Sequence, residues 1–381
     1  MYFDNAATTQ ILPEVLDRFM ESSLQFYGNP SALHEAGYQS GRALLQARKT
    51  LASLIKGKES NLFFTSGGTE SNNLSLIGRL IQDKGQGHVL VSPLEHPSIL
   101  KVIQSHFFNE CTIEYVNVDD SGKIVLSDLI DKVRIDTVMF AISHVNGETG
   151  AVQPIEDIAR EVKKKNKKTH IHFDCVQSFG KIPLDVSKVE ADTFSFSAHK
   201  IHGPRGVGAL YATNPQKLKP LLYGGDQEKG LRPGTENLPG IIAFARAAEI
   251  AEASCLENYD KVTQLKKSFL DQLLANVEEI RLISNDDCSP YIVSMAVKDI
   301  RGEVLVHHLE QQSIYISTGS ACTSRKKNKQ EFLKKMINDW RYEEGILRIS
   351  FNSQHQDDEI NQLVFCLSND IHEIRKIIRG K

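Results

Sequence analysis

A histidine and a lysine directly follow a short strand-like run in the middle of this 381-residue chain. Residues 192–197 alternate small or polar side chains with Phe194 and Phe196, which predicts a strand that ends in the loop Ala198-His199-Lys200. A lysine held just beyond a strand end, beside hydroxyls and another cation, suits an amine that stays near-neutral and forms a Schiff base. Taken alone, these residues also fit a surface lysine in a glycine loop, because a glycine-spaced run follows at 203–208.

A second candidate for chemistry is Cys322, which lies among small residues at 317–324 and directly before the basic run Arg325 to Lys329. Nearby cations lower the pKa of a thiol, so this is the profile of an exposed nucleophile, with an accidental loop cysteine as the alternative. The remaining cysteines are scattered without a C-x-x-C pair, which predicts neither a disulfide framework nor a metal site. They are interpreted as small buried hydrophobic residues: Cys111, Cys175, Cys255, Cys288 and Cys366.

An anion site is predicted where the strand-like run 61–65 meets Ser66-Gly67-Gly68-Thr69 and an apolar helical face. The start of a helix offers free backbone N–H groups and a positive dipole end to a negatively charged ligand. The turn matches neither G-x-G-x-x-G nor a Walker A loop, so it does not indicate a dinucleotide or ATP site. An ordinary capped helix start is the alternative.

Strand-like and helical segments alternate through the first two thirds of the chain, which predicts a mostly parallel α/β sheet. Such sheets bind ligands at the carboxyl ends of their strands, where the candidate polar side chains lie. A lone aspartate there is often a helix cap and a lone histidine a loop residue, but four such ends together indicate one site. The strands are predicted at 88–92, 137–143, 170–173, 192–197 and 207–211, the helices at 31–55, 97–107, 127–133 and 155–165, and the polar ends at Glu95-His96, His144 to Asn146, Asp174 to Gln177 and His199-Lys200.

The character of the sequence changes near residues 250–260, where short strands begin to alternate with helices. This predicts a large α/β domain at 16–255 and a smaller α+β domain formed by 256–381 and a turn-rich N-terminal arm at 1–15. The predicted helices are 238–257, 259–277, 302–311 and 357–378, and the predicted strands are 292–297, 313–317 and 346–350.

The net charge of −3 argues against a general nucleic-acid binder. The N-terminal residues do not form a signal or transit peptide, and no apolar run reaches the length of a membrane span. We therefore expect a cytoplasmic protein that binds neither nucleic acid nor membrane directly.

The ordered set of motifs resembles the NifS/IscS-like cysteine desulfurases, which are class-V aminotransferases, over essentially the whole chain. The long segment after Cys322 is similar to the group with an extended cysteine loop. The resemblance implies the pyridoxal-phosphate-dependent transferase fold of type I, aspartate aminotransferase-like, and a homodimer. The motifs that carry it are Phe3 to Thr9, Gly28 to Ser31, Thr65 to Ser71, Glu95-His96, His144 to Asn146, Asp174 with Gln177, Ser197 to Lys200, Arg232 to Asn237, Ser320 to Cys322 and Arg348 to Ser350.

Roles for individual residues follow from the resemblance. It implies that Lys200 holds the aldehyde of pyridoxal 5'-phosphate, that Asp174 pairs with the pyridine nitrogen, and that Gln177 donates to the ring oxygen. His96 would stack on the ring and help to shuttle protons, and Cys322 would attack the substrate sulfur. The phosphate would be held by Gly68, Thr69, Ser197 and His199, with Thr235 reaching it across the dimer interface, and the substrate carboxylate by Asn146 and Arg348.

The implied activity is conversion of L-cysteine to L-alanine, with the sulfur left on Cys322 as a persulfide for an acceptor protein. The acceptor would be an iron–sulfur cluster scaffold or a tRNA thiolation enzyme, and the basic run after Cys322 would attract it. The alternatives are a selenocysteine lyase, another enzyme of the aminotransferase fold, or a non-catalytic scaffold. Two positions depart from the family pattern, Asn352 after the substrate arginine and Asp226 in a glycine-rich stretch.

Overall fold

Two β-sheets organise the part of the chain that the computed structural model describes, residues 1–82, 85–318, 333–334 and 336–379. The larger sheet has seven strands in the order β1-β7-β6-β5-β4-β2-β3. Strand β7 is antiparallel to both neighbours and the remaining pairs are parallel, so the sheet is mixed and mostly parallel, as predicted. Its strands are β1 (Leu62–Thr65), β2 (Gln86–Val91), β3 (Glu110–Tyr115), β4 (Thr137–Ser143), β5 (His170–Asp174), β6 (Thr193–Ser197) and β7 (Gly208–Ala212).

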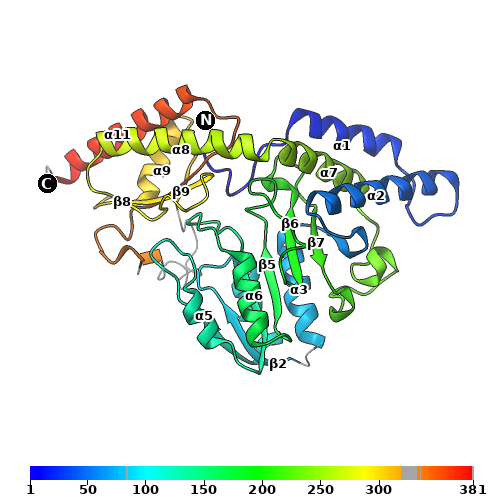
Figure 1. Ribbon diagram of the computed structural model, residues 1–381. Coiled ribbons are helices and arrows are strands. Elements are labelled where there is room, and N and C mark those ends of the chain that lie inside the picture. The colour runs from blue at the N-terminus through cyan, green and yellow to red at the C-terminus, as the bar shows by residue number, and fades with distance from the viewer. Residues whose placement is uncertain (83–84, 319–332, 335, 380–381) are drawn as a thin grey trace.

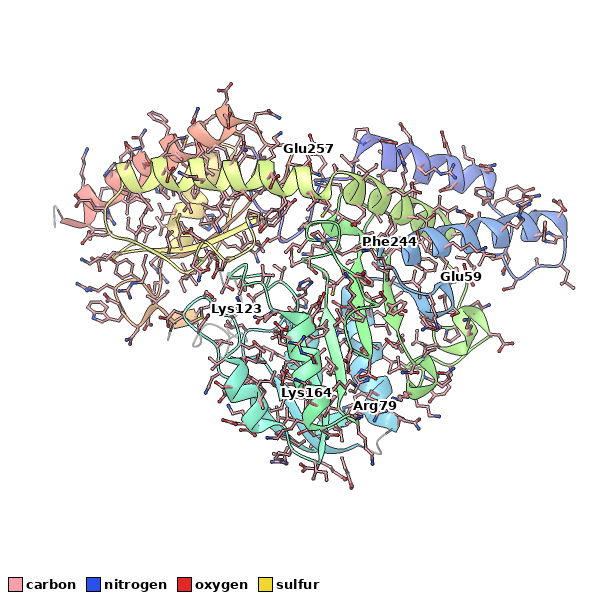
Figure 2. All side chains as sticks on the ribbon, viewed as in Figure 1. Glu59, Arg79, Lys123, Lys164, Phe244 and Glu257 are labelled. Carbon is pink, nitrogen blue, oxygen red and sulfur yellow. The ribbon has the colours of Figure 1, made fainter. Side chains whose placement is uncertain are left out.

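Helices cover both faces of this sheet (Figure 1). One face packs on α1 (Pro13–Gln25), α2 (Glu35–Leu54), α5 (Leu126–Lys132), α6 (Ile155–Lys165) and α7 (Leu238–Ala253), and the other packs on α3 (Gly68–Gln82) and α4 (Pro97–Ile103). Phe244 of α7 lies inside the molecule, whereas the charged Lys164 and Glu257 lie at its surface (Figure 2).

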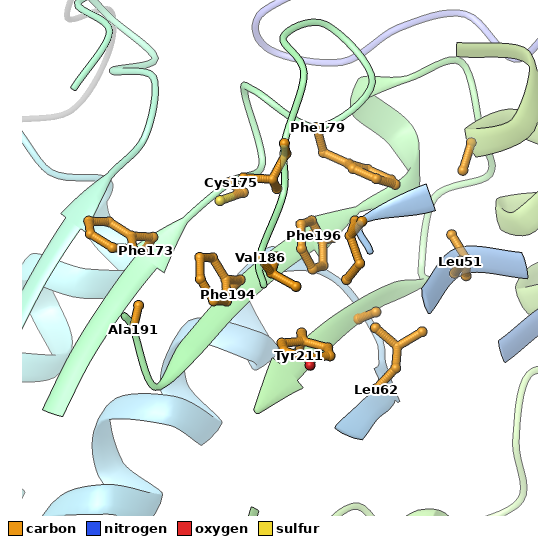
Figure 3. Packing of buried hydrophobic residues seen from close by; sticks show 14 of the residues in the cluster. Leu51, Leu62, Phe173, Cys175, Phe179, Val186, Ala191, Phe194, Phe196 and Tyr211 are labelled. Carbon is orange, nitrogen blue, oxygen red and sulfur yellow. The ribbon is translucent and has the colours of Figure 1, made fainter. Parts of the chain in front are cut away.

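Alternation along β5 and β6 separates an apolar face from a polar face. Phe173, Phe194 and Phe196 join the core under α2, α6 and α7, where Figure 3 shows their rings side by side with Tyr211 of β7. The intervening side chains, including His172, are polar and lie on the α3 side, because successive residues of a strand point to opposite faces. The sequence of these strands therefore places polar groups beside the site.

The smaller sheet is antiparallel, in the order β10-β11-β9-β8. Its strands are β8 (Ile280–Leu282), β9 (Ile292–Val297), β10 (Ser317–Thr318) and β11 (Ile346–Ser350), and it packs with α8 (Cys255–Asn276), α9 (Gly302–Gln311) and α11 (Asp357–Arg379). Figure 1 shows α8 and α11 lying along one another above this sheet. The N-terminal arm joins it through bridges from Tyr2 to Tyr315 and from Asp4 to Ser350. The domain boundaries at 15/16 and 255/256 stay a prediction.

Most of the predicted elements are present, five of them with the predicted bounds: β4, α6, β9, α9 and β11. Among the described residues, one α-helix and two strands were not predicted. Helix α1 begins inside the expected arm, with Pro13 in its first turn; β3 lies at the edge of the large sheet with only partial burial, and β8 has three residues. The strand expected at 313–317 is displaced to β10, since Ser313 has a positive φ of 58° that ends the preceding turn. Over the described ranges, no helix combines the length and hydropathy that a membrane crossing requires.

Phe3 anchors the N-terminal arm and generates a stability prediction. Its side chain is fully buried, with ring centroids 6.0 Å from Phe351 and 4.4 Å from His355. We expect Phe3→Ala to lower the free energy of unfolding by about 3–5 kcal/mol through lost burial and the cavity left behind. Urea denaturation followed by circular dichroism measures this, and Ile135→Ala, at a side chain 96% exposed, is the control. Equal effects of the two substitutions would contradict the anchoring role of Phe3.

Candidate active site

A cavity of about 760 Å³ lies at the carboxyl ends of the parallel strands of the large sheet. Residues that follow β2, β5 and β6 line it together with the turn between β1 and α3, the N-terminal arm and Arg348 of β11. Nine of the predicted site residues are in this lining: Gly68, Thr69, His96, Asp174, Gln177, Ser197, His199, Lys200 and Arg348. The strand ends that looked separate in sequence therefore meet in one place.

Lys200 ends the 3-10 helix η3 (Ala198–Lys200), which directly follows β6. Its Nζ donates hydrogen bonds to the carbonyl oxygens of Ala6 and Ala7, the latter at 2.7 Å. Burial lowers the pKa of the Lys200 amine to about 8, and the Arg348 guanidinium acts in the same direction. A substantial fraction of the amine is therefore neutral and nucleophilic near physiological pH.

Asp174 is the last residue of β5 and is 5% exposed. Its Oδ1 accepts from the backbone N–H of Val176 at 2.9 Å, and its Oδ2 accepts from Nδ2 of Asn72 on α3 at 2.7 Å. Asp174 therefore presents a hydrogen-bonded carboxyl group to the cavity. Each oxygen keeps a lone pair for a further donor.

The turn from β1 into α3 forms the anion-binding end of the cavity. Gly67 has a φ of +152°, and a Cβ on Gly68 would lie 2.6 Å from Cγ2 of Val176, so glycine is required at both positions. The first N–H groups of α3 open at this turn beside Thr69 and the Oγ of Ser197, which is buried without a partner among the described residues. An anion would supply acceptors to these donors.

His199 lines the same cavity as a neutral ring. Its Nδ1 lies 3.1 Å from Oγ1 of Thr8, and burial, with the charges of Lys200 and Arg205, lowers its pKa to about 4. Arg205 and Thr8 also line the cavity, although neither was predicted as a site residue. The available signal for Arg205 was its place in the glycine-spaced run immediately after Lys200.

Arg348 brings the smaller sheet to the site. It is 9% exposed, and its guanidinium donates to Asp4 at 3.0 Å, to Glu148 at 3.4 Å and to the carbonyl oxygen of Gly147 at 3.0 Å. Burial raises the pKa of Asp4, while the Arg348 charge opposes that shift. The Nε of Arg348 is buried without a partner in the described part of the chain, which leaves a donor for a carboxylate ligand.

Gln177 and Asn146 are both hydrogen-bonded within the protein. Gln177 lines the cavity and donates from Nε2 to the Ala6 carbonyl oxygen at 2.8 Å. Asn146 does not line it: its Nδ2 donates to the Leu94 carbonyl oxygen, and its Oδ1 accepts from the N–H groups of Glu148 and Thr149, each at 3.0 Å. Its amide holds the turn that carries Glu148, so the predicted contact with a substrate carboxylate stays a prediction.

The last predicted residues lie away from the cavity or outside the described chain. Thr235 is exposed and is not in the lining. Cys322, with the basic run Arg325 to Lys329, lies outside the described residues. Of the two departures, Asn352 donates to Oδ1 of Asn5 at 2.9 Å and so supports the N-terminal arm, while Asp226 precedes the short helix η5 (Gln227–Gly230).

The lining fits a ligand with an aldehyde, a basic ring nitrogen and a phosphate. Lys200 offers a near-neutral amine, Asp174 a buried carboxylate with free lone pairs, and Ser197 an unpartnered hydroxyl beside a helix start. These three chemical groups suit pyridoxal 5'-phosphate, the cofactor used by class-V aminotransferases.

Comparison with known proteins agrees with this reading of the site. Residues 1–363 match the model of the family described as "Aminotransferase class-V". The chain is 34% identical over 380 residues to a "Cysteine desulfurase" of Trichormus azollae, covering 99% of this chain and 94% of that protein. A solved "NIFS-LIKE PROTEIN" superposes with a TM-score of 0.90 at 35% identity, covering 97% of this chain and 98% of the other. A structure titled "SspA in complex with cysteine" superposes with a TM-score of 0.78 at 29% identity, covering 92% of this chain and 98% of the other.

The environment of Lys200 predicts how the apoprotein reacts with pyridoxal phosphate. The rate of Schiff-base formation should rise with pH to a midpoint of about 8, because only the amine deprotonated above its pKa is nucleophilic. Arg348→Met should move this midpoint upward, by up to about one pH unit, because it removes a cation and leaves Asp4 and Glu148 uncompensated. Stopped-flow absorbance between pH 6 and 10 measures both midpoints. Arg341→Met, at an exposed pair with Asp339, is the control, and a wild-type midpoint near 10.5 would contradict the prediction.

Proposed function

Because the chain belongs to the class-V aminotransferase family and is related over its whole length to NifS- and IscS-like cysteine desulfurases, we propose that it is a pyridoxal-phosphate-dependent cysteine desulfurase. The observation that carries the proposal is the meeting of Lys200, Asp174, His96 and Arg348 in one cavity. These side chains offer an amine, a carboxylate, an imidazole and a guanidinium, which together suit a zwitterionic amino-acid substrate.

Pyridoxal phosphate, when bound, supplies an aldehyde for amine exchange and a ring that accepts the electron pair released at the substrate α-carbon. Asp174 would accept a hydrogen bond from the ring nitrogen and favour its protonated form. Gln177 would donate to the ring oxygen, and the helix start at Gly68 with Thr69, Ser197 and His199 would hold the phosphate.

Lys200 has two tasks in this proposal. It would hold the cofactor through its aldehyde, and as a free amine it would take the α-proton of L-cysteine at Nζ. A pKa near 8 suits both tasks, since the amine is neutral often enough to accept a proton and basic enough to keep it. Arg348 binds the substrate carboxylate, with its unpartnered Nε as one donor, whereas Asn146 holds the turn that carries Glu148.

Cys322 takes the sulfur. Its thiolate forms a bond to the substrate sulfur as the bond from that sulfur to the β-carbon breaks, and the three-carbon fragment is protonated and leaves as L-alanine. L-cysteine and the enzyme thiol thus become L-alanine and an enzyme persulfide, without an external oxidant. The persulfide is then passed to an acceptor protein for iron–sulfur cluster assembly or tRNA thiolation.

Two substitutions test the activity. With L-cysteine and pyridoxal phosphate, the wild-type protein should release alanine, and with a reductant also sulfide. Lys200→Ala should lower the rate by at least about 10³-fold and remove the visible absorbance of the bound aldehyde, because the covalent amine is lost. Cys322→Ser should keep that absorbance and abolish desulfuration.

The same assay separates the rival reactions. An aminotransferase needs no loop thiol, so Cys322→Ala would leave amino-group transfer intact. Equal desulfuration by wild type and Cys322→Ala would contradict the role proposed for this thiol. A colourless wild-type protein that does not respond to pyridoxal phosphate would overturn the proposed function as a whole.

We also propose that the enzyme is a homodimer. The α1 and α2 pair extends beyond the sheet (Figure 1). Met20 and Leu24 of α1 and Tyr27 of the connection to α2 are exposed apolar side chains, and Tyr223 is exposed in the segment before Thr235. Exposed apolar groups of this kind favour an interface between copies. The exposed Thr235 would then reach the phosphate of the partner subunit.

Subunit mixing tests this arrangement. Lys200→Ala and Thr235→Ala homodimers should each be impaired. A mixture refolded together should recover about a quarter of wild-type activity, because half of the dimers are mixed and each of those holds one intact site. Recovery is measured against a control mixture of Lys200→Ala with itself. A monomer in analytical ultracentrifugation, or no recovery on mixing, would contradict the proposal.

A further inference from the structure

His96 is held by Ser98 at a single ring nitrogen. The backbone N–H of Ser98 donates to Nδ1 of His96 at 3.1 Å, and the Oγ of Ser98 lies 2.7 Å from the same nitrogen. His96 is the residue before α4, and its side chain caps the first turn of that helix. A backbone N–H only donates, so Nδ1 is the accepting, unprotonated nitrogen of the ring.

Asn72 sets the direction of the second bond. A carboxylate oxygen of Asp174 only accepts, so the group 2.7 Å from it is the NH₂ of Asn72. The same NH₂ group donates its other hydrogen to Oγ of Ser98 at 2.8 Å. The Ser98 hydroxyl thus accepts from Asn72, and its own hydrogen points to Nδ1 of His96. Two donors therefore converge on Nδ1.

The amide oxygen of Asn72 is fixed from the opposite side. It lies 2.9 Å from Nε2 of His172, whose Nδ1 lies 3.0 Å from Oγ1 of Thr193. Burial lowers the pKa of His172 to about 3, so the ring is neutral and donates from Nε2 to Asn72. Reversing the amide would place its oxygen against the Asp174 carboxylate, and no solvent reaches this contact, since Asn72 is 1% exposed.

We propose that Ser98 and Asn72 lock His96 as the neutral tautomer with its hydrogen on Nε2, and that His96 therefore acts in the reaction as a fixed hydrogen-bond donor and ring-stacking group rather than as a base. Asn72 and Ser98 are positioning residues, since each acts through another side chain. The role of His96 in the reaction rests on the proposed function, whereas the assignment of its tautomer does not. The family resemblance implies that His96 shuttles protons; in this proposal His96 instead donates a hydrogen bond and stacks on the ring, and Lys200 alone takes the α-proton.

The physical reason is the geometry at Nδ1. A ring that already carries hydrogen on Nε2 can only gain a proton at Nδ1, where the Ser98 N–H would have to be displaced and the Ser98 hydroxyl would have to turn its hydrogen away. The surrounding charge does not compensate for this loss. The carboxylates Glu70, Glu95, Glu148 and Asp174 line the cavity together with His199 and the cations Lys101, Lys200, Arg205 and Arg348, so the two signs oppose each other around the ring.

Nitrogen NMR of the protein labelled with ¹⁵N-histidine tests the tautomer, before and after loading with pyridoxal phosphate. The His96 signals are identified by their absence in His96→Gln. In wild type we expect Nε2 to carry a hydrogen and Nδ1 to stay unprotonated and hydrogen-bonded from pH 8 to 5.5. The midpoint for protonation of His96 should then lie at least about one pH unit below the usual 6.5. Ser98→Ala removes one donor and should raise the midpoint by about one unit. Ser105→Ala, whose hydroxyl donates to the Val102 carbonyl oxygen, should change nothing.

The wild-type spectrum decides the question even if a variant fails to fold. Hydrogen on Nδ1, or protonation of both nitrogens near pH 6.5, would overturn the proposal. Kinetics give a second readout: His96→Gln should lower kcat with L-cysteine by no more than about tenfold, whereas loss of a general base costs about 10²–10⁴. The acidic limb of the pH profile should stay in His96→Gln, and its disappearance would also overturn the proposal. If wild type fails to desulfurate cysteine, the proposed function fails while the tautomer result stands.

Discussion

The contact between Lys200 and the N-terminal arm is the interaction on which the site depends. The buried amine donates to the carbonyl oxygens of Ala6 and Ala7, which stabilises it without an ion pair that would return its lowered pKa toward the usual value. The same arm is hydrogen-bonded to the smaller sheet, where Asn5 donates to the Ser350 carbonyl oxygen and the Ala6 N–H donates to the Ser350 hydroxyl. One short segment therefore connects the amine to both sheets.

This connection explains why Arg348, in the middle of β11, faces a cavity built on the other sheet. Asp4 of the arm accepts from the guanidinium, and Glu148 accepts from it on the side of the larger sheet. Partners from two parts of the chain hold a buried cation in one orientation, and the cation in turn lowers the pKa of Lys200. The nucleophilicity of the amine thus depends on residues more than 140 positions away in the sequence.

Beneath the cavity, a continuous set of hydrogen bonds connects Asp174 to the interior of the molecule. Asn72 contacts Asp174, Ser98 and His172, and Thr193 lies within 3.1 Å of both His172 and His170. Burial lowers the pKa of His170 to about 4, so the network is built from neutral rings and amides around a single carboxylate. The bonds from Asn72 and from the N–H of Val176 hold the Asp174 carboxylate in one orientation, which suits a carboxylate that must face one ring nitrogen.

The sequence by itself determined most of the elements and which polar groups end the strands. Local pattern accounts for the alternation in β5 and β6, for the glycines at the start of α3 and for Lys200 and Asp174 at strand ends, because side-chain periodicity and turn chemistry are local properties. Only the tertiary structure decided that Asn146 turns its amide into its own loop, that Arg205 and Asp4 reach the site, and that Ser98 and Asn72 orient His96. These contacts join segments far apart in the chain, and their distances depend on how the two sheets and the arm pack, which no local pattern encodes.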